Sequence, residues 1–357
     1  MMNEIVRLDF KAILNHPLPW ERFAGKTVLV TGAGGFLSAY MVETLLRLNQ
    51  EALSDSEPVH VIALVRNEEA ARIRFSAYRN DPRLEYLVQD VCEPIELNPK
   101  REIHYVIHAA SQASPKLFGS DPVGTLSANV LGTANLLRLA ADNPIDSFLY
   151  FSSSEVYGEL NPSLIPNKEL DYGYLDPTSV RSCYAESKRM GETMCVAWHR
   201  QFGVPVKIVR PYHTYGPGMR LDDGRVFADF VRNVVERRDI VMRSDGTDTR
   251  AFCYISDATI GFFTVMLLGG IAEAYNVGNP DCEVSIALLA DKMTRLFPET
   301  GLSVVREPRP DISYMQSPVH RSCPDIAKVS RLGWKPAIGI EDGFRRTVLS
   351  FGGERGL

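Results

Sequence analysis

The chain has 357 residues, a formal net charge of −5 at pH 7 and 45% hydrophobic residues. It is long enough to bury a sizeable core, and its composition is that of a soluble globular protein. The negative charge gives no electrostatic argument for nucleic acid or an anionic membrane, so we expect neither as a partner. The six cysteines form no Cys-x-x-Cys pair and lack ligand-like His spacing, which predicts reduced thiols and no metal site.

Residues 1–24 read as an extension that packs on the outside of the fold, with Pro17, Pro19 and Trp20 as its anchor. The opening MMNEIVRLDFK lacks the apolar core of a secretory signal. The most apolar stretch, 260–272, is too short to cross a bilayer. We therefore expect a cytoplasmic protein without a membrane span.

From residue 26 onward, short apolar runs alternate with stretches of helical periodicity. This alternation predicts an α/β fold with a Rossmann-like, doubly wound parallel sheet. The expected strands are 26–30, 59–65, 84–88, 105–110, 147–153 and 206–212, and the main expected helices are 37–48, 123–142 and 183–202. The pattern weakens from about residue 213, which predicts a smaller mixed lobe over the carboxyl edge of the sheet.

A glycine-rich segment, TGAGGFLSAY (31–40), follows the first strand and opens a helix. Gly32 permits the tight turn and Gly35 lets the backbone approach a pyrophosphate at the positive helix end. The third position of the pattern is Ser38, whose small side chain can still pack near the strand. This context, between a strand and a helix, predicts a dinucleotide site.

The second strand ends in ALVRN, where an acid would bind a ribose 2′-hydroxyl but Arg66 stands instead. Arg66 could meet a 2′-phosphate or be a solvated loop cation, so NAD is expected and NADP stays open. Asp90, after the third strand, suits either the adenine edge or a helix cap. The expected cofactor contacts are Gly32, Gly35, Phe36, Leu37, Arg66, Asp90, Val91, Ala109, Ala110 and Lys188.

Ser153, in SSSEVYG, precedes Tyr184 by 31 residues, and Lys188 follows Tyr184 by one helical turn. Side chains at i and i+4 share a helix face, so the ammonium is expected to lower the phenol's pKa. A serine hydroxyl delivered by another segment can then relay a proton between the phenolate and a substrate alcohol. This equipment suits hydride transfer between a carbinol and a nicotinamide ring.

With these motifs in order, the chain resembles the extended short-chain dehydrogenases/reductases that rebuild nucleotide-activated sugars. Within this group, which includes NAD-dependent epimerases and dehydratases, it looks most like the UDP-glucuronate decarboxylases. The resemblance covers residues 26 to about 345. It is carried by QDVCEPI (89–95), HAASQASP (108–115), SSSEVYG (152–158), RSCYAESKR (181–189), TYGPGMRLDDGRV (214–226), DTRAFCYISD (248–257), YNVGNP (275–280) and RSCPDIAKVSRLGWKP (321–336).

The resemblance implies that Ser153 is the catalytic Ser/Thr, Glu155 its acidic partner, Tyr184 the base and Lys188 a cofactor-ribose contact. It also implies that the substrate is a nucleotide sugar, with a UDP-sugar favoured. The implied substrate contacts are Ser111, His213, Arg220, Arg225, Arg250 and Arg321.

Two departures from the family pattern fall beside the sugar and phosphate. His213 replaces the usual asparagine before TYGP, and Gly218 replaces the usual arginine after it. Arg220 is a candidate replacement for that arginine. Arg250 and Arg321 match arginines that hold the diphosphate.

The reading we favour is transient oxidation at C4 that leads to decarboxylation of UDP-glucuronate, giving UDP-xylose or a 4-keto pentose. A nucleotide-hexose 4,6-dehydratase or a C4 epimerase is the alternative, and a dinucleotide-sensing binding module is the alternative outside enzymes. Glu155 favours the decarboxylase, and Ser154, where many dehydratases carry an acid, argues against dehydration. Candidates for binding the substrate's carboxylate are Arg181, Lys116 and Ser114.

The resemblance also sets the expected domain limits. Residues 25–212 and about 247–270 should form the dinucleotide-binding domain, and 213–246 with 271–357 the nucleotide-sugar-binding lobe. A homodimer is expected through helices 123–142 and 183–202.

Overall fold

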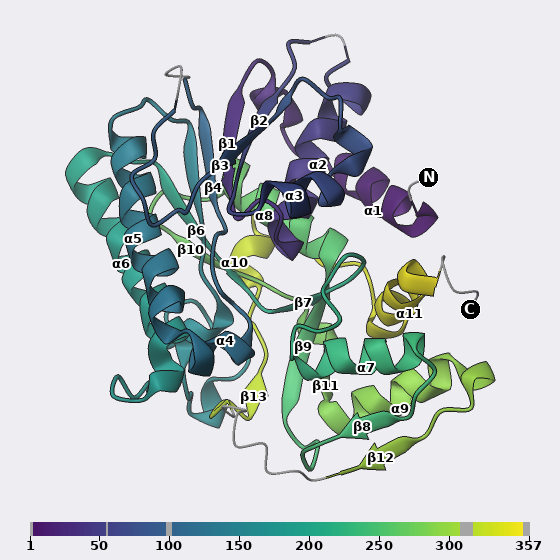
Figure 1. Cartoon of the computed structure of the whole chain (residues 1–357). Helices are drawn as coiled ribbons and strands as arrows, with labels where there is room; N and C mark the ends of the chain where they lie inside the picture. The colour runs from purple at the N-terminus through teal and green to yellow at the C-terminus, as the bar shows by residue number, and fades with distance from the viewer. Residues whose placement is uncertain (1–2, 55, 98–101, 308–316, 353–357) are drawn as a thin grey trace.

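The computed structural model describes residues 3–54, 56–97, 102–307 and 317–352. Its centre is a seven-stranded sheet in the order β10-β6-β5-β4-β1-β2-β3, and every neighbouring pair is parallel (Figure 1). The expected Rossmann-like fold is confirmed. The strands are β1 (Thr27–Thr31), β2 (His60–Val65), β3 (Leu84–Val88), β4 (Tyr105–His108), β5 (Ser147–Phe151), β6 (Val206–Pro211) and β10 (Ala274–Val277).

Helices cover both faces of this sheet, because successive strand side chains point to opposite sides. Val28 and Val30 of β1 join one hydrophobic cluster with α2 (Phe36–Glu51) and α8 (Ile255–Leu268). Leu29, between them, joins the opposite cluster with α5 (Pro122–Ala141) and α6 (Cys183–Phe202). α5 and α6 lie side by side on the outer face in Figure 1. The shorter helices are α3 (Glu68–Arg74), α4 (Pro115–Ser120) and α10 (Ala327–Ser330).

A smaller mixed lobe lies at the carboxyl edge of the sheet, as expected (Figure 1). In its main sheet β9 pairs in parallel with β7 and β13 and antiparallel with β11, and β8 pairs with β12 separately. The strands are β7 (His213–Tyr215), β8 (Ile240–Met242), β9 (Thr249–Tyr254), β11 (Glu283–Ser285), β12 (Val304–Arg306) and β13 (Arg321–Ser322), and the helices are α7 (Val226–Val235), α9 (Ile286–Leu296) and α11 (Ile340–Gly352).

The chain crosses between the two sheets at other points than the expected domain limits. β9 belongs to the small sheet, although 247–270 was assigned to the dinucleotide-binding domain. β10 belongs to the large sheet, although 271–357 was assigned to the other lobe. Both strands are short and lie close to α8 in the chain, so the local pattern gives no sign of which sheet each one joins.

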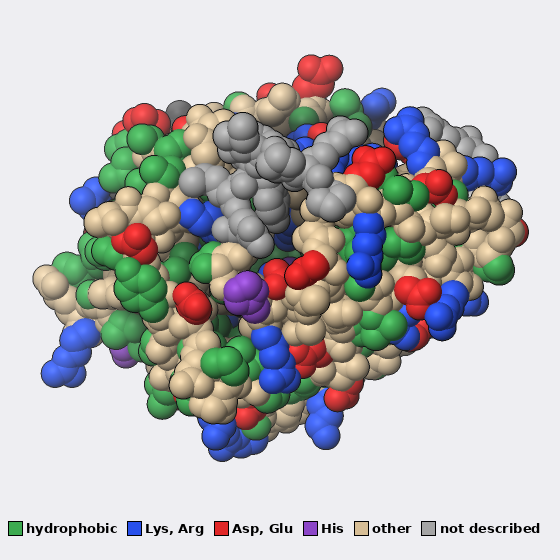
Figure 2. All heavy atoms as spheres, turned by 90° about the horizontal axis from the view of Figure 1, so that it is seen from below, with side chains coloured by type: hydrophobic (Ala, Val, Ile, Leu, Met, Phe, Trp, Pro, Cys, Tyr) green, Lys and Arg blue, Asp and Glu red, His purple; other side chains and the backbone are tan. Residues whose placement is uncertain are grey.

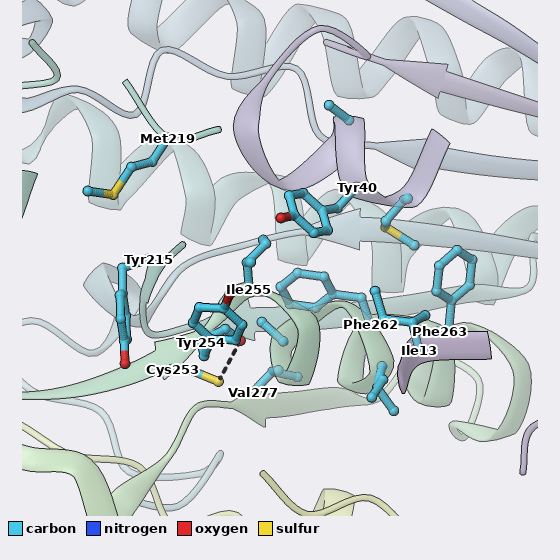
Figure 3. Packing of buried hydrophobic residues seen from close by; sticks show 14 of the residues in the cluster. Ile13, Tyr40, Tyr215, Met219, Cys253, Tyr254, Ile255, Phe262, Phe263 and Val277 are labelled. Carbon is cyan, nitrogen blue, oxygen red and sulfur yellow. Dashed lines mark hydrogen bonds between the residues drawn. The ribbon is translucent and has the colours of Figure 1, made fainter. Parts of the chain in front are cut away.

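The extension is more than an outer layer. Its helix α1 (Glu4–Leu14) places Phe10 and Ile13, both fully buried, in the main core, and Ile13 lies beside Phe262 and Phe263 of α8 (Figure 3). Trp20 follows in the short helix η1 (Trp20–Phe23) and meets Phe263 edge to face at 5.1 Å. The anchoring expected of Trp20 is therefore seen, on a segment that also builds the core.

None of the helices formed by the described residues is both long and apolar enough to cross a membrane. On the face shown in Figure 2, basic side chains lie among acidic ones rather than in a patch of one sign.

Candidate active site

The predicted acid–base residues come from two adjoining elements, the segment after β5 and the first turns of α6. Ser153 caps the short helix η3 (Ser154–Tyr157), and its Oγ accepts a hydrogen bond of 3.2 Å from the Glu155 N–H. Tyr184 lies in the first turn of α6, with Lys188 one turn further along. The structure brings these residues together: Ser153, Tyr184 and Lys188 are all buried, and the Ser153 hydroxyl lies near enough to the Tyr184 phenol to influence its pKa.

The pKa of the Tyr184 phenol is raised, chiefly because burial disfavours the phenolate. The nearby Ser153 hydroxyl acts in the opposite direction. We expected a lowered pKa for this phenol beside Lys188, whose Nζ lies 5.8 Å from the ring centroid. In the structure without a ligand the pKa is instead raised overall, because burial outweighs the influences that lower it.

Burial also destabilises the charged form of Lys188. Its Nζ donates to the Phe151 carbonyl oxygen at 2.6 Å, and desolvation lowers its pKa to about 7. The nearby Glu192 carboxylate opposes this lowering. The ammonium is therefore poised to change its charge near neutral pH.

We call the group of Ser153, Tyr184 and Lys188 the relay. An ion pair lies next to it. Arg181 Nη2 is 3.0 Å from Glu155 Oε2, and the guanidinium also lies 4.9 Å from the Phe118 ring centroid. Phe118 stacks on Tyr184 with 5.0 Å between centroids. Glu155 and Arg181 line a cavity of about 240 Å³, and Arg181 Nε is buried without a hydrogen-bond partner in the described part of the chain. The site thus offers a cation beside the relay that can exchange partners.

The glycine-rich segment has the form that a dinucleotide pyrophosphate requires. Gly32 has φ +61°, and a Cβ there would lie 2.7 Å from Ala110 Cα. Gly35 caps α2 without any side-chain capping bond, so the first N–H groups of the helix remain available. Ser38 is buried and its Oγ donates to the Gly32 carbonyl at 2.6 Å, which accounts for the small residue at this position. The residues therefore fit the cofactor.

The other cofactor candidates gather at the same edge. Arg66 is exposed after β2, and it lies close enough to Asp90 after β3 to lower the pKa of that carboxyl. The larger cause of that lowering is the Cys92 N–H, which donates to Asp90 Oδ1 at 2.9 Å. Asp90 thus caps its own turn. The remaining candidates follow neighbouring strands or open α2: Phe36, Leu37, Val91, Ala109 and Ala110.

The arginines predicted to bind the substrate are bonded to nearby chain atoms. Arg250 donates to the carbonyls of Val319 at 2.7 Å and His320 at 3.0 Å. Arg321 forms a two-bond pair with Glu283, and Arg225 pairs with Asp223. The diphosphate-binding role expected of them requires that a ligand replace these partners.

Arg220 stands apart from this group. Its side chain is 79% exposed and pairs with Asp222, so the structure does not place it as a replacement for the missing arginine. Instead, the Arg74 guanidinium lies where a side chain at Gly218 would begin, with Nη1 2.5 Å from a Cβ built there. A contact between α3 and this loop could not be anticipated from the sequence.

His213 and Ser111 each bring an unpaired polar atom to the site. Within the described residues, His213 Nδ1 and Ser111 Oγ are buried without a hydrogen-bond partner. Burial, with help from Arg250 and Arg225, holds the pKa of His213 well below its usual value, so the imidazole is neutral. Neutral donors or acceptors of this kind suit sugar hydroxyls.

Phe118 was missed in the sequence. It lies in the six-residue helix α4, which is too short for any periodic pattern, and its stacking on Tyr184 joins segments 66 residues apart in the chain. His108 is hydrogen-bonded on both ring nitrogens, to Thr31 at 2.9 Å and Thr133 at 3.0 Å.

A Rossmann-like sheet, a glycine turn at a helix end and a buried Ser-Tyr-Lys group together define a nicotinamide-dependent dehydrogenase of the short-chain type. Residues 28–278 match the NAD dependent epimerase/dehydratase family. The chain belongs to this family of enzymes, which confirms the resemblance and supports NAD as its cofactor.

Known relatives agree with this assignment. UDP-glucuronic acid decarboxylase 6 of Arabidopsis thaliana is 35% identical, over 88% of this chain and 86% of the relative. Among solved structures, UDP-glucuronic acid 4-epimerase of Bacillus cereus, bound to UDP-glucuronic acid and NAD, has a TM-score of 0.76 at 22% identity, over 91% of this chain and 98% of that one. A dTDP-glucose 4,6-dehydratase of Streptomyces venezuelae with NAD bound also has a TM-score of 0.76, at 25% identity, over 92% and 98%.

Proposed function

We propose that this enzyme decarboxylates UDP-glucuronate to a UDP-pentose, UDP-xylose or its 4-keto form. The observation that carries the proposal is the Arg181 guanidinium, which lies beside the Ser153–Tyr184 relay with its Nε unpaired. A decarboxylase must hold a carboxylate next to the carbon that it oxidises, and a guanidinium binds carboxylates in a two-bond geometry. The curated relatives with this activity add support.

The nicotinamide ring supplies a hydride acceptor and donor when it is bound. The chain's own residues do the proton chemistry. Tyr184, as phenolate, takes the proton of the C4 hydroxyl through Ser153. The resulting 4-ketone lies β to the C6 carboxylate, so the C5–C6 bond breaks with loss of carbon dioxide and leaves an enolate, which is then protonated at C5. Lys188 as an ammonium stabilises the phenolate.

Glu155 and Arg181 act at the carboxylate end of the sugar. With Arg181 holding the carboxylate, Glu155 is displaced from its ion pair. The sugar carboxylate would then lie at the cavity that Glu155 and Arg181 line. No deprotonation of C5 is needed, which distinguishes this reaction from 4,6-dehydration.

The diphosphate of the substrate's nucleotide would bind to the arginines of the smaller lobe. Arg250, Arg225 and Arg321 would exchange their present carboxylate and carbonyl partners for the diphosphate. His213 and Ser111 would hydrogen-bond the sugar. NAD is the proposed cofactor. The alternative is NADP, whose 2′-phosphate Arg66 would contact.

The test is product analysis with UDP-glucuronate labelled with ¹³C at C6, using purified protein and added NAD. The expected result is labelled carbon dioxide and an unlabelled UDP-pentose in equal amounts. An Arg181→Lys variant should lose most of this activity, since an ammonium cannot form the two-bond contact. Recovery of label only in an epimerised uronate, or in unchanged substrate, would refute the proposal.

We also propose that two copies of the chain associate through α5 and α6. Exposed hydrophobic side chains lie on these two adjacent helices, and exposed apolar surface is a feature of interfaces. They are Val123, Leu126, Leu131, Met190 and Val196, all at least 38% exposed. Sedimentation should show a dimer for the wild type and a monomer for Leu131→Asp combined with Met190→Asp. A wild-type monomer at micromolar concentration would contradict the proposal.

A further inference from the structure

A buried ion pair lies directly behind the catalytic segment. Arg210 of β6 is 1% exposed, and its Nε and Nη2 donate to the two carboxylate oxygens of Glu192 at 2.8 and 2.6 Å. Glu192 Oε1 also accepts from the Ser152 hydroxyl at 2.5 Å. Ser152 immediately precedes Ser153, so the pair reaches the relay through one hydrogen bond.

The same arginine holds the other end of that segment. Arg210 Nη1 donates to the Tyr157 hydroxyl at 2.9 Å and to the Glu169 carbonyl at 2.7 Å. Tyr157 ends the short helix η3 that carries Glu155. The segment with both Ser153 and Glu155 is thus bonded at each end to one ion pair.

Glu192 also lies one turn beyond Lys188 on α6, the spacing at which side chains face each other. The Lys188 ammonium bonds only to the Phe151 carbonyl among the described partners, and the Glu192 charge favours it. Burial raises the pKa of Cys195 and of Tyr150 and lowers that of His108 to about 3, so these neighbours are uncharged at neutral pH. The groups that face Lys188 are Tyr184, Glu192 and Cys195 of α6, Tyr150 of β5 and His108 of β4.

A contribution to folding stability does not by itself explain why Glu192 and Arg210 form a buried ion pair here. Desolvation of two charges offsets most of their attraction, and apolar replacements of buried pairs are often equally stable. A structural role would be served by side chains that pack against η3 and β6 without charge. The contacts to both ends of the catalytic segment suggest a different role.

We propose that the Glu192–Arg210 pair is a positioning element of the active site. It fixes Ser153 and Glu155 through Ser152 and Tyr157, and it supplies the negative charge that keeps Lys188 an ammonium. The inference rests on the relay of the proposed function, but not on the identity of the sugar.

Two variants separate the two roles. Glu192→Gln keeps an acceptor for Ser152 but removes the charge, so loss of the Lys188 proton should occur at lower pH. The alkaline limb of the kcat profile should move down by about one pH unit, with a kcat loss of about tenfold on that limb and an unchanged KM. Ser152→Ala keeps the charge and breaks the hydrogen bond, so kcat should fall while the limb stays in place.

The matched control is Glu186→Gln, which removes a carboxylate on the same helix that pairs with Arg189. It should leave both kcat and the alkaline limb unchanged. Should Glu192→Gln fail to fold, Tyr157→Phe still tests the positioning role, because it removes the Arg210 contact at the far end of the segment, together with the hydrogen bond from Tyr157 to Asn276. A kcat loss without a limb shift is expected for it.

A substrate-free readout keeps this test distinct from the proposed function. The ultraviolet titration difference between a protein and its Tyr184→Phe partner reports ionisation of Tyr184 alone. Glu192→Gln should move that ionisation to higher pH, since the ammonium that stabilises the phenolate is lost earlier. Unshifted titration in Glu192→Gln together with wild-type kcat in Ser152→Ala and Tyr157→Phe would overturn the inference, whatever substrate the enzyme uses.

Discussion

The proposed acid–base residues and the arginines proposed to bind the nucleotide lie on neighbouring elements but in different surroundings. Ser153, Tyr184 and Lys188 are at most 8% exposed, and Lys188 is held by a buried hydrogen bond to the Phe151 carbonyl. The side chains of Arg250 and Arg321 are 12% and 43% exposed and are bonded to local carbonyls and carboxylates. On the proposed function, the Ser153–Tyr184–Lys188 group is in place before the ligand binds, whereas the arginines would exchange partners.

This difference has a physical reason. Proton and hydride transfer tolerate displacements of only a fraction of an ångström, so their groups must be preorganised. A diphosphate brings two negative charges and many acceptor oxygens, which can compete with single carbonyls and carboxylates for a guanidinium. Changes to the relay should therefore affect kcat, and changes to the arginines should affect KM.

The largest effect is expected for Tyr184→Phe. Removing the group that moves the proton should lower kcat about 10³-fold, within the usual range for general acid–base catalysis, with NAD binding retained. Steady-state kinetics and NAD titration measure both. Tyr275→Phe, which alters a buried hydroxyl on β10 bonded to Glu273, is the control and should retain activity. Less than a tenfold loss in Tyr184→Phe would show that another group moves the proton.

A smaller effect is expected for Arg250→Ala. Loss of a charge-assisted contact to the diphosphate should raise KM about 10- to 100-fold while kcat changes little. Arg220→Ala is the matched comparison, because that arginine is exposed and pairs only with Asp222 among described residues. Its KM should remain within about twofold of wild type on the scale of exposed ion pairs. Equal KM values for the two variants would remove Arg250 from the nucleotide site.

Asp9 links the extension to the second lobe, and its substitution should change the free energy of unfolding rather than the reaction rate. It is fully buried and accepts from the Tyr254 hydroxyl at 2.9 Å, and burial raises its pKa to about 7. The folded protein therefore holds this proton between about pH 4 and pH 7, where the unfolded chain has released it. Stability should fall as pH rises through that window and level off above it.

Asp9→Asn should flatten part of this slope, measured by urea unfolding at several pH values. Glu43, with a pKa also raised to about 7 by burial, should leave the remainder. Glu299→Gln, an exposed substitution, should not alter the slope. A slope in Asp9→Asn as steep as in the wild type would mean that Asp9 is not protonated in the folded state.

The smallest effect concerns Arg66. As an exposed residue it should contribute little to NAD, so Arg66→Ala should keep the NAD affinity within about threefold. If Arg66 contacts the 2′-phosphate of NADP, Arg66→Ala should instead weaken NADP binding about tenfold. Fluorescence titration with both coenzymes measures the ratio, and a loss of NAD affinity larger than that of NADP would contradict this assignment.

The sequence predicted the regular part of the fold well and the second lobe less well. α6 has the expected limits, and β1 to β6 lie within a few residues of the apolar runs, because a strand buried on both faces must be apolar throughout. β9 and β10 were not predicted as strands, and the expected domain ranges do not follow the sheets that they join, since strands of six and four residues carry no mark of their partners.

At the site, the clustering of Ser153, Tyr184 and Lys188 was predictable. Tyr184 and Lys188 are one turn apart on a helix, and Ser153 follows the end of a strand. The stacking of Phe118 on Tyr184 was not, because it depends on a loop path. The raised pKa of Tyr184 was also missed, because desolvation depends on how completely the fold covers the ring.

The most direct test of the proposed decarboxylation is the reaction of UDP-glucuronate in D₂O, followed by mass spectrometry of the nucleotide sugar. Protonation of the enolate from solvent predicts a UDP-pentose that carries one deuterium, at C5. A product that retains six sugar carbons, with or without deuterium, would contradict the account.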